Sequence, residues 1–166
     1  LMKIRPEEEI WNYQQIELGY NYRMNDIQAA LGLSQMKRVD HYVKIRQKIA
    51  KTYDKELSNL PIKTPSRSSK MYSSYHLYPV RIQEGTKDKN QKQIFQELRE
   101  NNIAVNLHYI PVHRQPYYEN LGFKKEQFPE SEKFHREAIS LPMFPTLSAQ
   151  QQKIVIDSLI KAIKTK

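Results

Sequence analysis

The sequence predicts an α+β fold in which helices cover a small sheet. Amphipathic stretches alternate along the chain with short runs of β-branched and aromatic residues, an order typical of this class. The sequence contains no internal repeat and no low-complexity tract. Its 166 residues are enough for one domain, or for one domain with a short extension, and for a substantial core.

The first 24 residues contain no long element. Residues 1–18 are polar and mixed, and two expectations stay open for them: a short strand and turn, or the tail of a preceding domain. Residues 19–24 form a polar, aromatic loop that leads directly into a helical stretch. The loop carries an amide, two phenols and a guanidinium, which are groups that recognise ligands.

Two helical stretches follow this loop. Asn25 or Asp26 is expected to cap the first, because a short polar side chain can accept from the free amides of the first turn. Residues 39–57 form the second, with apolar side chains at three- and four-residue spacings on one face. The pattern leaves open whether residues 25–57 form one helix or bend near Asp40.

The remaining residues alternate between strands and helices. Strands are expected at 75–82 and 103–107, an extended piece at 140–142, and helices at 88–101, 115–121, 130–139 and after Ser148. Pro79 would confine the first strand to a sheet edge or to the start of a ladder, because proline has no N–H to donate.

Charge and composition narrow the classes of partner. The net charge of +9 is compatible either with an anionic partner or with a solvated basic surface. The basic residues are dispersed and the aromatic residues form no repeated stacking platform, so we expect no nucleic acid partner. No apolar run approaches the roughly 20 residues that cross a bilayer. Cysteine is absent, which excludes disulfides and thiolate metal sites and fits a cytoplasmic protein.

Several familiar catalytic patterns are missing from the sequence. His108 and His113 could suggest a metal site, but Pro111 between them prevents a shared helical face, and we expect no bound metal. The chain has no Gly-x-Ser-x-Gly turn and no glycine-rich phosphate loop. His108 and Tyr109 instead follow a short apolar run and precede a proline, a position that commonly lines a cleft. The alternative is that both side chains close the core with satisfied polar tips.

Five segments, taken in order, resemble the C-terminal part of the DegT-type nucleotide-sugar aminotransferases, which use pyridoxal phosphate (PLP). They are Gly-Tyr-Asn-Tyr-Arg at 19–23, Asp-Ile-Gln-Ala-Ala at 26–30, His-Leu-Tyr at 76–78, His-Tyr-Ile-Pro at 108–111 and Leu-Pro at 141–142. The resemblance covers about residues 19–163. Asn102 stands where the family usually has glycine, and asparagine tolerates a left-handed turn well. The form of the loop is similar to that in the aminotransferases of pseudaminic acid biosynthesis, which act on a UDP-linked 4-keto-6-deoxy sugar.

The resemblance implies an architecture. It implies the C-terminal small domain of a type I, aspartate aminotransferase-like PLP enzyme, with a small antiparallel sheet covered by helices. Residues 1–24 would then be the end of the large-domain connection and the active-site loop, residues 25–58 a long connecting helix, and residues 59–166 the small α/β domain. Enzymes of this family form homodimers whose active site is shared between subunits.

The resemblance also implies roles for individual residues. Asn21 would contact the PLP phosphate of the neighbouring subunit, and its amide can donate two N–H bonds without adding charge. Tyr22 and Arg23 would lie near the nucleotide-sugar, where a guanidinium can fork to a diphosphate. The sugar-nucleotide pocket of the same subunit would be lined by Leu107, His108, Tyr109 and Ile110.

The implied function is the transfer of an amino group, with glutamate as the expected donor, to a 4-keto-6-deoxy nucleotide-sugar in surface-polysaccharide or glycan biosynthesis. The Schiff-base lysine of the family lies upstream of the matching segments, and no lysine here stands in its Ser-x-x-x-Lys context. We therefore expect this chain to be a fragment without activity of its own. A stand-alone basic module that binds a nucleotide or anion, or a dimerisation module, is the alternative.

Overall fold

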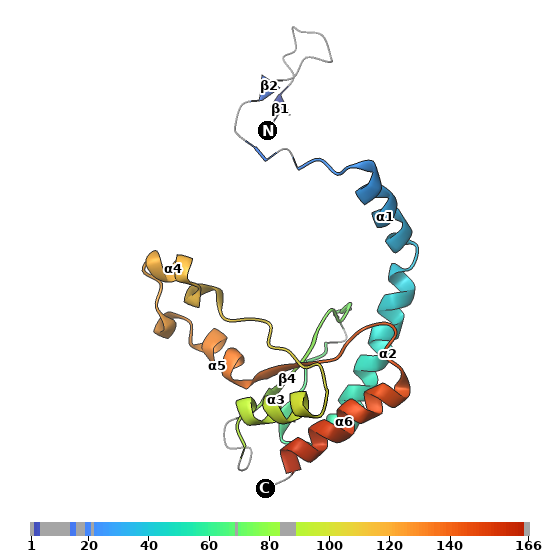
Figure 1. Cartoon of the computed structure of the whole chain (residues 1–166), viewed down its shortest axis with the longest axis vertical. Helices are drawn as coiled ribbons and strands as arrows, with labels where there is room; N and C mark the ends of the chain where they lie inside the picture. Colours follow the sequence, from blue (N-terminus) through green and yellow to red (C-terminus); the bar gives the residue numbers. More distant parts are fainter. Residues whose placement is uncertain are drawn as a thin grey trace. The chain divides into compact units, whose positions relative to one another are not determined.

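The computed structural model describes residues 2–3, 14–15, 19–20, 22–68, 70–83 and 89–164 (Figure 1). The chain divides into two compact units. We call Leu1–Val39 the N-terminal unit and Asp40–Lys166 the C-terminal unit. None of the helices in the described ranges is both long enough and apolar enough to cross a membrane.

The described residues of the N-terminal unit form two short strands and one helix. Strands β1 (Met2–Lys3) and β2 (Gln14–Gln15) pair antiparallel, which agrees with the strand alternative for this segment. Helix α1 (Asp26–Met36) is capped by Asn25. The Asn25 Oδ1 atom accepts from the Gln28 amide at 2.9 Å, and the Gln28 Oε1 atom accepts from the Asn25 amide at 3.1 Å. This reciprocal pair satisfies two amides at the start of the helix.

Helix α2 (Val39–Leu57) matches the predicted amphipathic stretch. A turn at residues 37–38 separates it from α1, so the expected long helix at 25–58 is interrupted. The interruption lies close to the bend that the sequence left open near Asp40. The buried residues of α2 follow helical spacing and form one face, consisting of Ile49, Ala50, Tyr53 and Leu57.

The C-terminal unit is built on a three-stranded antiparallel sheet in the order β3-β4-β5. The strands are β3 (Ile62–Lys63), β4 (Tyr78–Ile82) and β5 (Ala138–Leu141). Pro79 is the second residue of β4, and this strand lies between the other two. The proline is therefore at the start of the ladder and not on an edge strand, because β3 pairs only with the far end of β4 at Arg81 and Ile82.

Helices and turns complete the C-terminal unit. They are α3 (Gln91–Glu100), η1 (Val112–Arg114), α4 (Pro116–Asn120), η2 (Lys125–Gln127), α5 (Pro129–Glu137) and α6 (Ala149–Lys164). Helices α2, α3 and α6 contribute with β4 and β5 to one continuous hydrophobic core (Figure 1). Its fully buried side chains include Tyr53, Tyr78, Leu98, Ile139 and Leu159. The predicted α+β class, with helices covering a small antiparallel sheet, is confirmed.

Two local predictions are wrong. The strand expected at 103–107 is reduced to a single bridge between Asn106 and Ser140, although Ile103 and Val105 are buried as a strand would require. The helix expected at 130–139 ends at Glu137, because Ala138 and Ile139 already pair with β4 as part of β5. In both places the backbone conformation is determined by pairing with distant strands of the sheet. The local spacing of apolar residues does not predict this pairing.

Candidate functional site

The segment from Asn106 to Ile110 lies beside the central part of β5. The Ser140 amide donates to the Asn106 carbonyl at 2.8 Å, and the Asn106 amide donates to the Ser140 carbonyl at 3.2 Å. The Ser140 hydroxyl lies 2.9 Å from Nδ1 of His108. The segment is therefore fixed at its beginning by main-chain bonds and two residues later by a side-chain bond.

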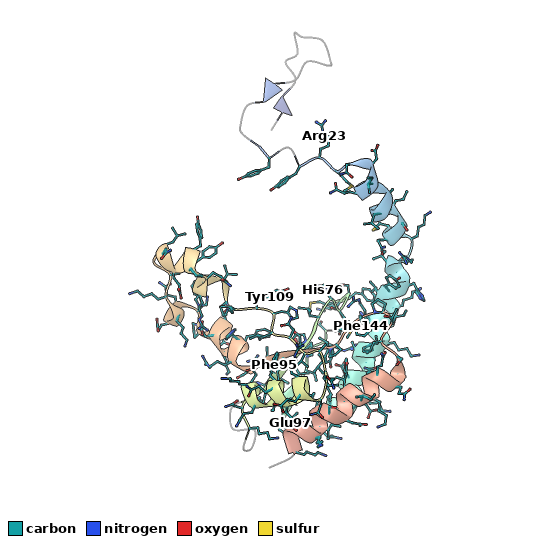
Figure 2. The ribbon with its side chains drawn as sticks, viewed as in Figure 1. Arg23, His76, Phe95, Glu97, Tyr109 and Phe144 are labelled. Carbon is teal, nitrogen blue, oxygen red and sulfur yellow. The ribbon has the colours of Figure 1, made fainter. Side chains whose placement is uncertain are left out.

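The four residues predicted to line a sugar-nucleotide pocket lie consecutively along this segment. Leu107 and His108 are half-buried, whereas Tyr109 and Ile110 are 72% and 52% exposed. The rings of His108 and Tyr109 are nearly perpendicular, with centroids 4.8 Å apart. Figure 2 shows Tyr109 among the side chains of the C-terminal unit. The structure thus gives His108 a satisfied inner nitrogen, as the core alternative requires, and leaves the Tyr109 ring open to a ligand.

The predicted loop residues lie in the N-terminal unit. Asn21 lies outside the described residues. Tyr22 is 92% exposed and stacks on Tyr20 with ring centroids 5.4 Å apart, and Arg23 is exposed (Figure 2). An exposed guanidinium beside exposed phenols is suited to an anionic or aromatic ligand.

Two residues important for this geometry were missed as site residues by sequence reasoning. Ser140 stands in the short extended piece predicted at 140–142, where a serine gives no indication of a binding or positioning role. Arg46 lies in the helix expected at 39–57 and was given no site role, yet its Nη1 atom donates to the carbonyls of Tyr75, His76 and Met143 at 3.1, 3.2 and 2.7 Å. It therefore ties α2 to two separate loops. An arginine on an otherwise apolar helical face was the available signal in the sequence.

The remaining ionisable groups near the core have structural partners. The Tyr78 hydroxyl donates to Asp54, which also pairs with Arg67. Burial raises the pKa of the Tyr78 phenol, and the bond to Asp54 raises it further, so this hydroxyl stays protonated and remains a donor. His113 Nε2 lies 3.0 Å from Glu132 Oε1, and both side chains are buried. His113 is thus engaged away from His108, and the part of the chain that the structure describes contains no cluster of metal-binding side chains.

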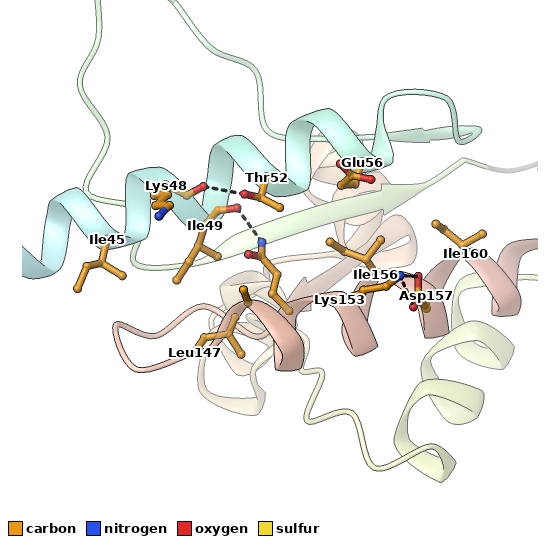
Figure 3. Close-up of a pocket in the computed structure, with 12 residues that line it drawn as sticks. Ile45, Lys48, Ile49, Thr52, Glu56, Leu147, Lys153, Ile156, Asp157 and Ile160 are labelled. Carbon is orange, nitrogen blue, oxygen red and sulfur yellow. Dashed lines mark hydrogen bonds and ion pairs between the residues drawn. The ribbon is translucent and has the colours of Figure 1, made fainter.

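A hollow between α2 and α6 has a volume of about 610 Å³ (Figure 3). Its apolar floor includes Ile45, Ile49 and Ile156, and Lys153 pairs with Asp157 at its rim at 2.9 Å. None of the predicted site residues that the structure describes is among its lining residues. A second hollow, of about 340 Å³, begins two residues after Ile110 and is lined by Val112, His113, Tyr118, Phe123, Phe128 and Ser131. This aromatic hollow continues the chain segment that carries His108 and Tyr109.

The lysines whose side chains the structure describes are exposed or half-buried. A Schiff-base lysine is activated by burial or by a neighbouring cation, either of which lowers its pKa. None of the lysines whose side chains are described is buried. Lys89 is half-buried and pairs with Glu97, and the hydrogen bond to Asp157 raises the pKa of Lys153. Burial therefore marks none of these lysines as an activated amine.

The sheet edge of the C-terminal unit and the exposed loop of the N-terminal unit each carry polar and aromatic side chains that can contact a ligand. A profile of the DegT/DnrJ/EryC1/StrS aminotransferase family matches residues 3–160, and the chain belongs to this family. The family depends on PLP.

Individual relatives agree with this assignment. The chain is 31% identical over 160 residues to a UDP-4-amino-4,6-dideoxy-N-acetyl-beta-L-altrosamine transaminase from Campylobacter jejuni, covering 95% of this chain and 42% of that protein. The solved structure of Helicobacter pylori PseC, an aminotransferase of pseudaminic acid biosynthesis, superposes with a TM-score of 0.83 at 27% identity and covers 99% of this chain and 43% of that one. Spr1654 of Streptococcus pneumoniae, solved in its PLP form, gives a TM-score of 0.81 at 29% identity, covering 93% of this chain and 39% of that one.

The chain spans about two fifths of the length of the curated relatives it matches, with shares of 41% and 39% for the first two.

Proposed function

We propose that this chain is the C-terminal small-domain part of a PLP-dependent aminotransferase that acts on a nucleotide-sugar. The complete enzyme transfers an amino group, with glutamate as donor, to a 4-keto-6-deoxy nucleotide-sugar in surface-polysaccharide or glycan biosynthesis, in the cytoplasm. The observation that carries this proposal is the segment 107–110, which offers a fixed imidazole and an open phenol at one edge of the sheet in a chain of this family. The name of the Campylobacter relative supports the class of substrate.

Each side chain of the segment has a binding role in this proposal. His108 uses Nε2 toward the diphosphate or the sugar, because Nδ1 is already engaged by Ser140. Tyr109 offers a ring that can stack and a hydroxyl that can donate. Leu107 and Ile110 supply the apolar surface that excludes water on either side of these groups.

The N-terminal unit contributes to the site of a second subunit in this proposal. Tyr22 and Arg23 reach the nucleotide-sugar of the partner, and Arg23 forks to its diphosphate. Asn21 donates its amide N–H groups to the cofactor phosphate. The enzyme is accordingly a homodimer whose active sites are each built from both subunits.

The cofactor is anchored outside this chain. When bound, PLP supplies the electron sink that makes transamination possible. The lysine that anchors it belongs to the part of the enzyme that precedes the matching segments, so the present chain alone is inactive. The groups of this chain bind and orient the substrate beside the cofactor and exclude water from the reacting atoms.

The proposal is tested by replacing His108 with alanine in the complete enzyme. We expect the Michaelis constant for the nucleotide-sugar to rise about tenfold, while the melting temperature falls only slightly, because a cleft residue contributes mainly to binding. His76→Ala is the matched control, since this histidine is exposed and its side chain lies on another loop. If the His108→Ala enzyme is destabilised but keeps its Michaelis constant for the nucleotide-sugar, the role of His108 is purely structural and the proposed binding role is wrong.

The net charge of +9 favours one alternative function, a module that binds a nucleotide or anion without chemistry. Binding of uridine diphosphate by the complete protein, without amino transfer to any 4-keto sugar nucleotide, would support that alternative.

A further inference from the structure

We propose that Ser140 is a positioning residue that sets the orientation and the tautomer of His108, and so determines which ring nitrogen meets the ligand. This inference rests on the proposed function for its kinetic consequence, but the orientation of His108 can be measured without any activity.

The main chain of Ser140 is hydrogen-bonded to the segment that carries His108. Ser140 lies opposite Pro79 in the register of β4 and β5. Successive residues of an antiparallel strand direct their main-chain N–H and C=O groups to opposite neighbours, so the main-chain groups of Ser140 face away from β4. On that side the amide and carbonyl of Ser140 bond to Asn106, at 2.8 and 3.2 Å. The Ser140 main chain therefore holds the segment that carries His108.

The hydroxyl of Ser140 completes the attachment. It lies 2.9 Å from His108 Nδ1, and Ser140 is only 6% exposed, so water competes little for this bond. Asn106 also holds the intervening residue, because its Oδ1 atom accepts from the Leu107 amide at 2.8 Å. Three consecutive residues are thus bonded to β5 or to each other, and the imidazole is held within the sheet edge.

The hydroxyl beside Nδ1 determines whether Nε2 of His108 can donate a hydrogen bond to a ligand. A serine hydroxyl can donate or accept, and the hydrogen bond of one ring nitrogen sets the proton on the other. When Ser140 donates to Nδ1, the neutral ring carries its proton on Nε2 and can donate to a phosphate or sugar oxygen. Without the hydroxyl, the ring is free to turn and to exchange its two neutral tautomers.

The chain offers a matched control for a lost hydroxyl. Tyr53 is fully buried, and its hydroxyl donates to the Pro142 carbonyl at 2.9 Å, two residues after Ser140. Tyr53→Phe therefore removes one hydrogen bond from the same stretch of chain without touching His108. Ser140→Thr retains the hydroxyl and serves as the conservative variant, whereas Ser140→Ala removes it with almost no change of volume.

The experiment uses the complete enzyme with 15N-labelled histidine, and compares the ring nitrogen resonances of His108 in the three variants. We expect Ser140→Ala to replace the single tautomer pattern by an averaged one, while Ser140→Thr and Tyr53→Phe keep the original pattern. In steady-state assays Ser140→Ala should raise the Michaelis constant for the nucleotide-sugar about 3- to 10-fold and change kcat by less than about twofold, the loss of one hydrogen bond.

Unchanged His108 resonances in Ser140→Ala would overturn the inference, as would an equal shift in Tyr53→Phe, which would mean general loosening of the sheet edge. An enzyme without aminotransferase activity would refute the proposed function alone. The resonances would then decide the role of Ser140, since they report the tautomer directly.

Discussion

Helices α1 and α6 begin in the same way but differ in what they bury. Each is closed at its start by a reciprocal pair of bonds, Asn25 with Gln28 in α1 and Ser148 with Gln151 in α6. Six residues of α6 are buried, whereas α1 buries none. The local signals that start a helix are therefore present in both units, and among the described residues only those of the C-terminal unit supply a surface for its helix to pack on.

The apolar residues of α1 occupy two opposite faces. Ile27 and Leu31 lie on one face, and Leu33 and Met36 lie on the other, and all four are more than half exposed. A helix with large apolar residues on two opposite faces differs from a typical surface helix, which has one such face, and 11 residues are too few for a stable isolated helix in water. The contrast with α6 indicates that α1 is made to be covered on both sides, which agrees with the proposed larger enzyme and its second subunit.

The largest expected difference between the two helices is in the stability lost when one leucine of each is replaced by alanine. Leu159→Ala in α6 removes a fully buried side chain and should destabilise the 166-residue chain by about 2–5 kcal/mol, because it leaves a cavity. Leu31→Ala in α1 should change the same chain by less than about 0.5 kcal/mol. Urea unfolding of both variants measures the difference.

The same pair sharpens the comparison in the complete enzyme. In that protein the loss of stability caused by Leu31→Ala should approach the loss caused by Leu159→Ala, because both faces of α1 are then covered. An equally small effect of Leu31→Ala in both proteins would show that α1 stays exposed.

A smaller effect is expected from removing the two helix caps. Ser148→Ala should lower the stability of the C-terminal unit by about 1 kcal/mol, since α6 unfolds together with the core. Asn25→Ala should instead reduce the helical circular dichroism of the 166-residue chain without moving its main unfolding transition. A shift of that transition by Asn25→Ala would mean that α1 and the C-terminal unit unfold as one.

The smallest effect concerns pH and is confined to the C-terminal unit, which contains all five histidines. Partial burial lowers the pKa of His135, and the nearby Arg114 lowers it further. The unfolded chain therefore takes up this proton first as the pH falls. The contribution of His135 to stability is full above the ordinary histidine pKa of about 6.5 and declines as the pH falls through that value.

His135→Gln should reduce this decline, so the melting temperature of the variant should fall less than that of the parent chain between about pH 7 and pH 5. The helical signal of α1 should not follow the same profile. Identical slopes for parent and variant would contradict the role of His135.

The sequence predicts the helices of this protein better than its strands. Helices α2, α3 and α6 carry regular apolar spacing over ten or more residues, and the structure places them within a few residues of the expected bounds. The strand at 103–107 failed because Ile103 and Val105 alternate like strand residues while only Asn106 finds a partner. Pairing is a property of two distant segments, and neither segment alone contains it.

The candidate site shows the same limit. The segment 107–110 is visible in the sequence because a short apolar run, a histidine, a tyrosine and a proline follow one another. Ser140 is not visible in this way, because its importance arises from its bridge to Asn106 and from a bond to a residue 32 positions away. The role proposed for Asn21 remains a prediction.

The way in which Arg46 is bonded has a consequence for how this domain can vary during evolution. Its three acceptors are main-chain oxygens, which every amino acid possesses. The attachment therefore depends on the donor at position 46, whose Nη1 atom makes all three bonds. The residues at 75, 76 and 143 are under no such restriction from this contact. The loops can exchange these side chains without losing the bonds to Arg46.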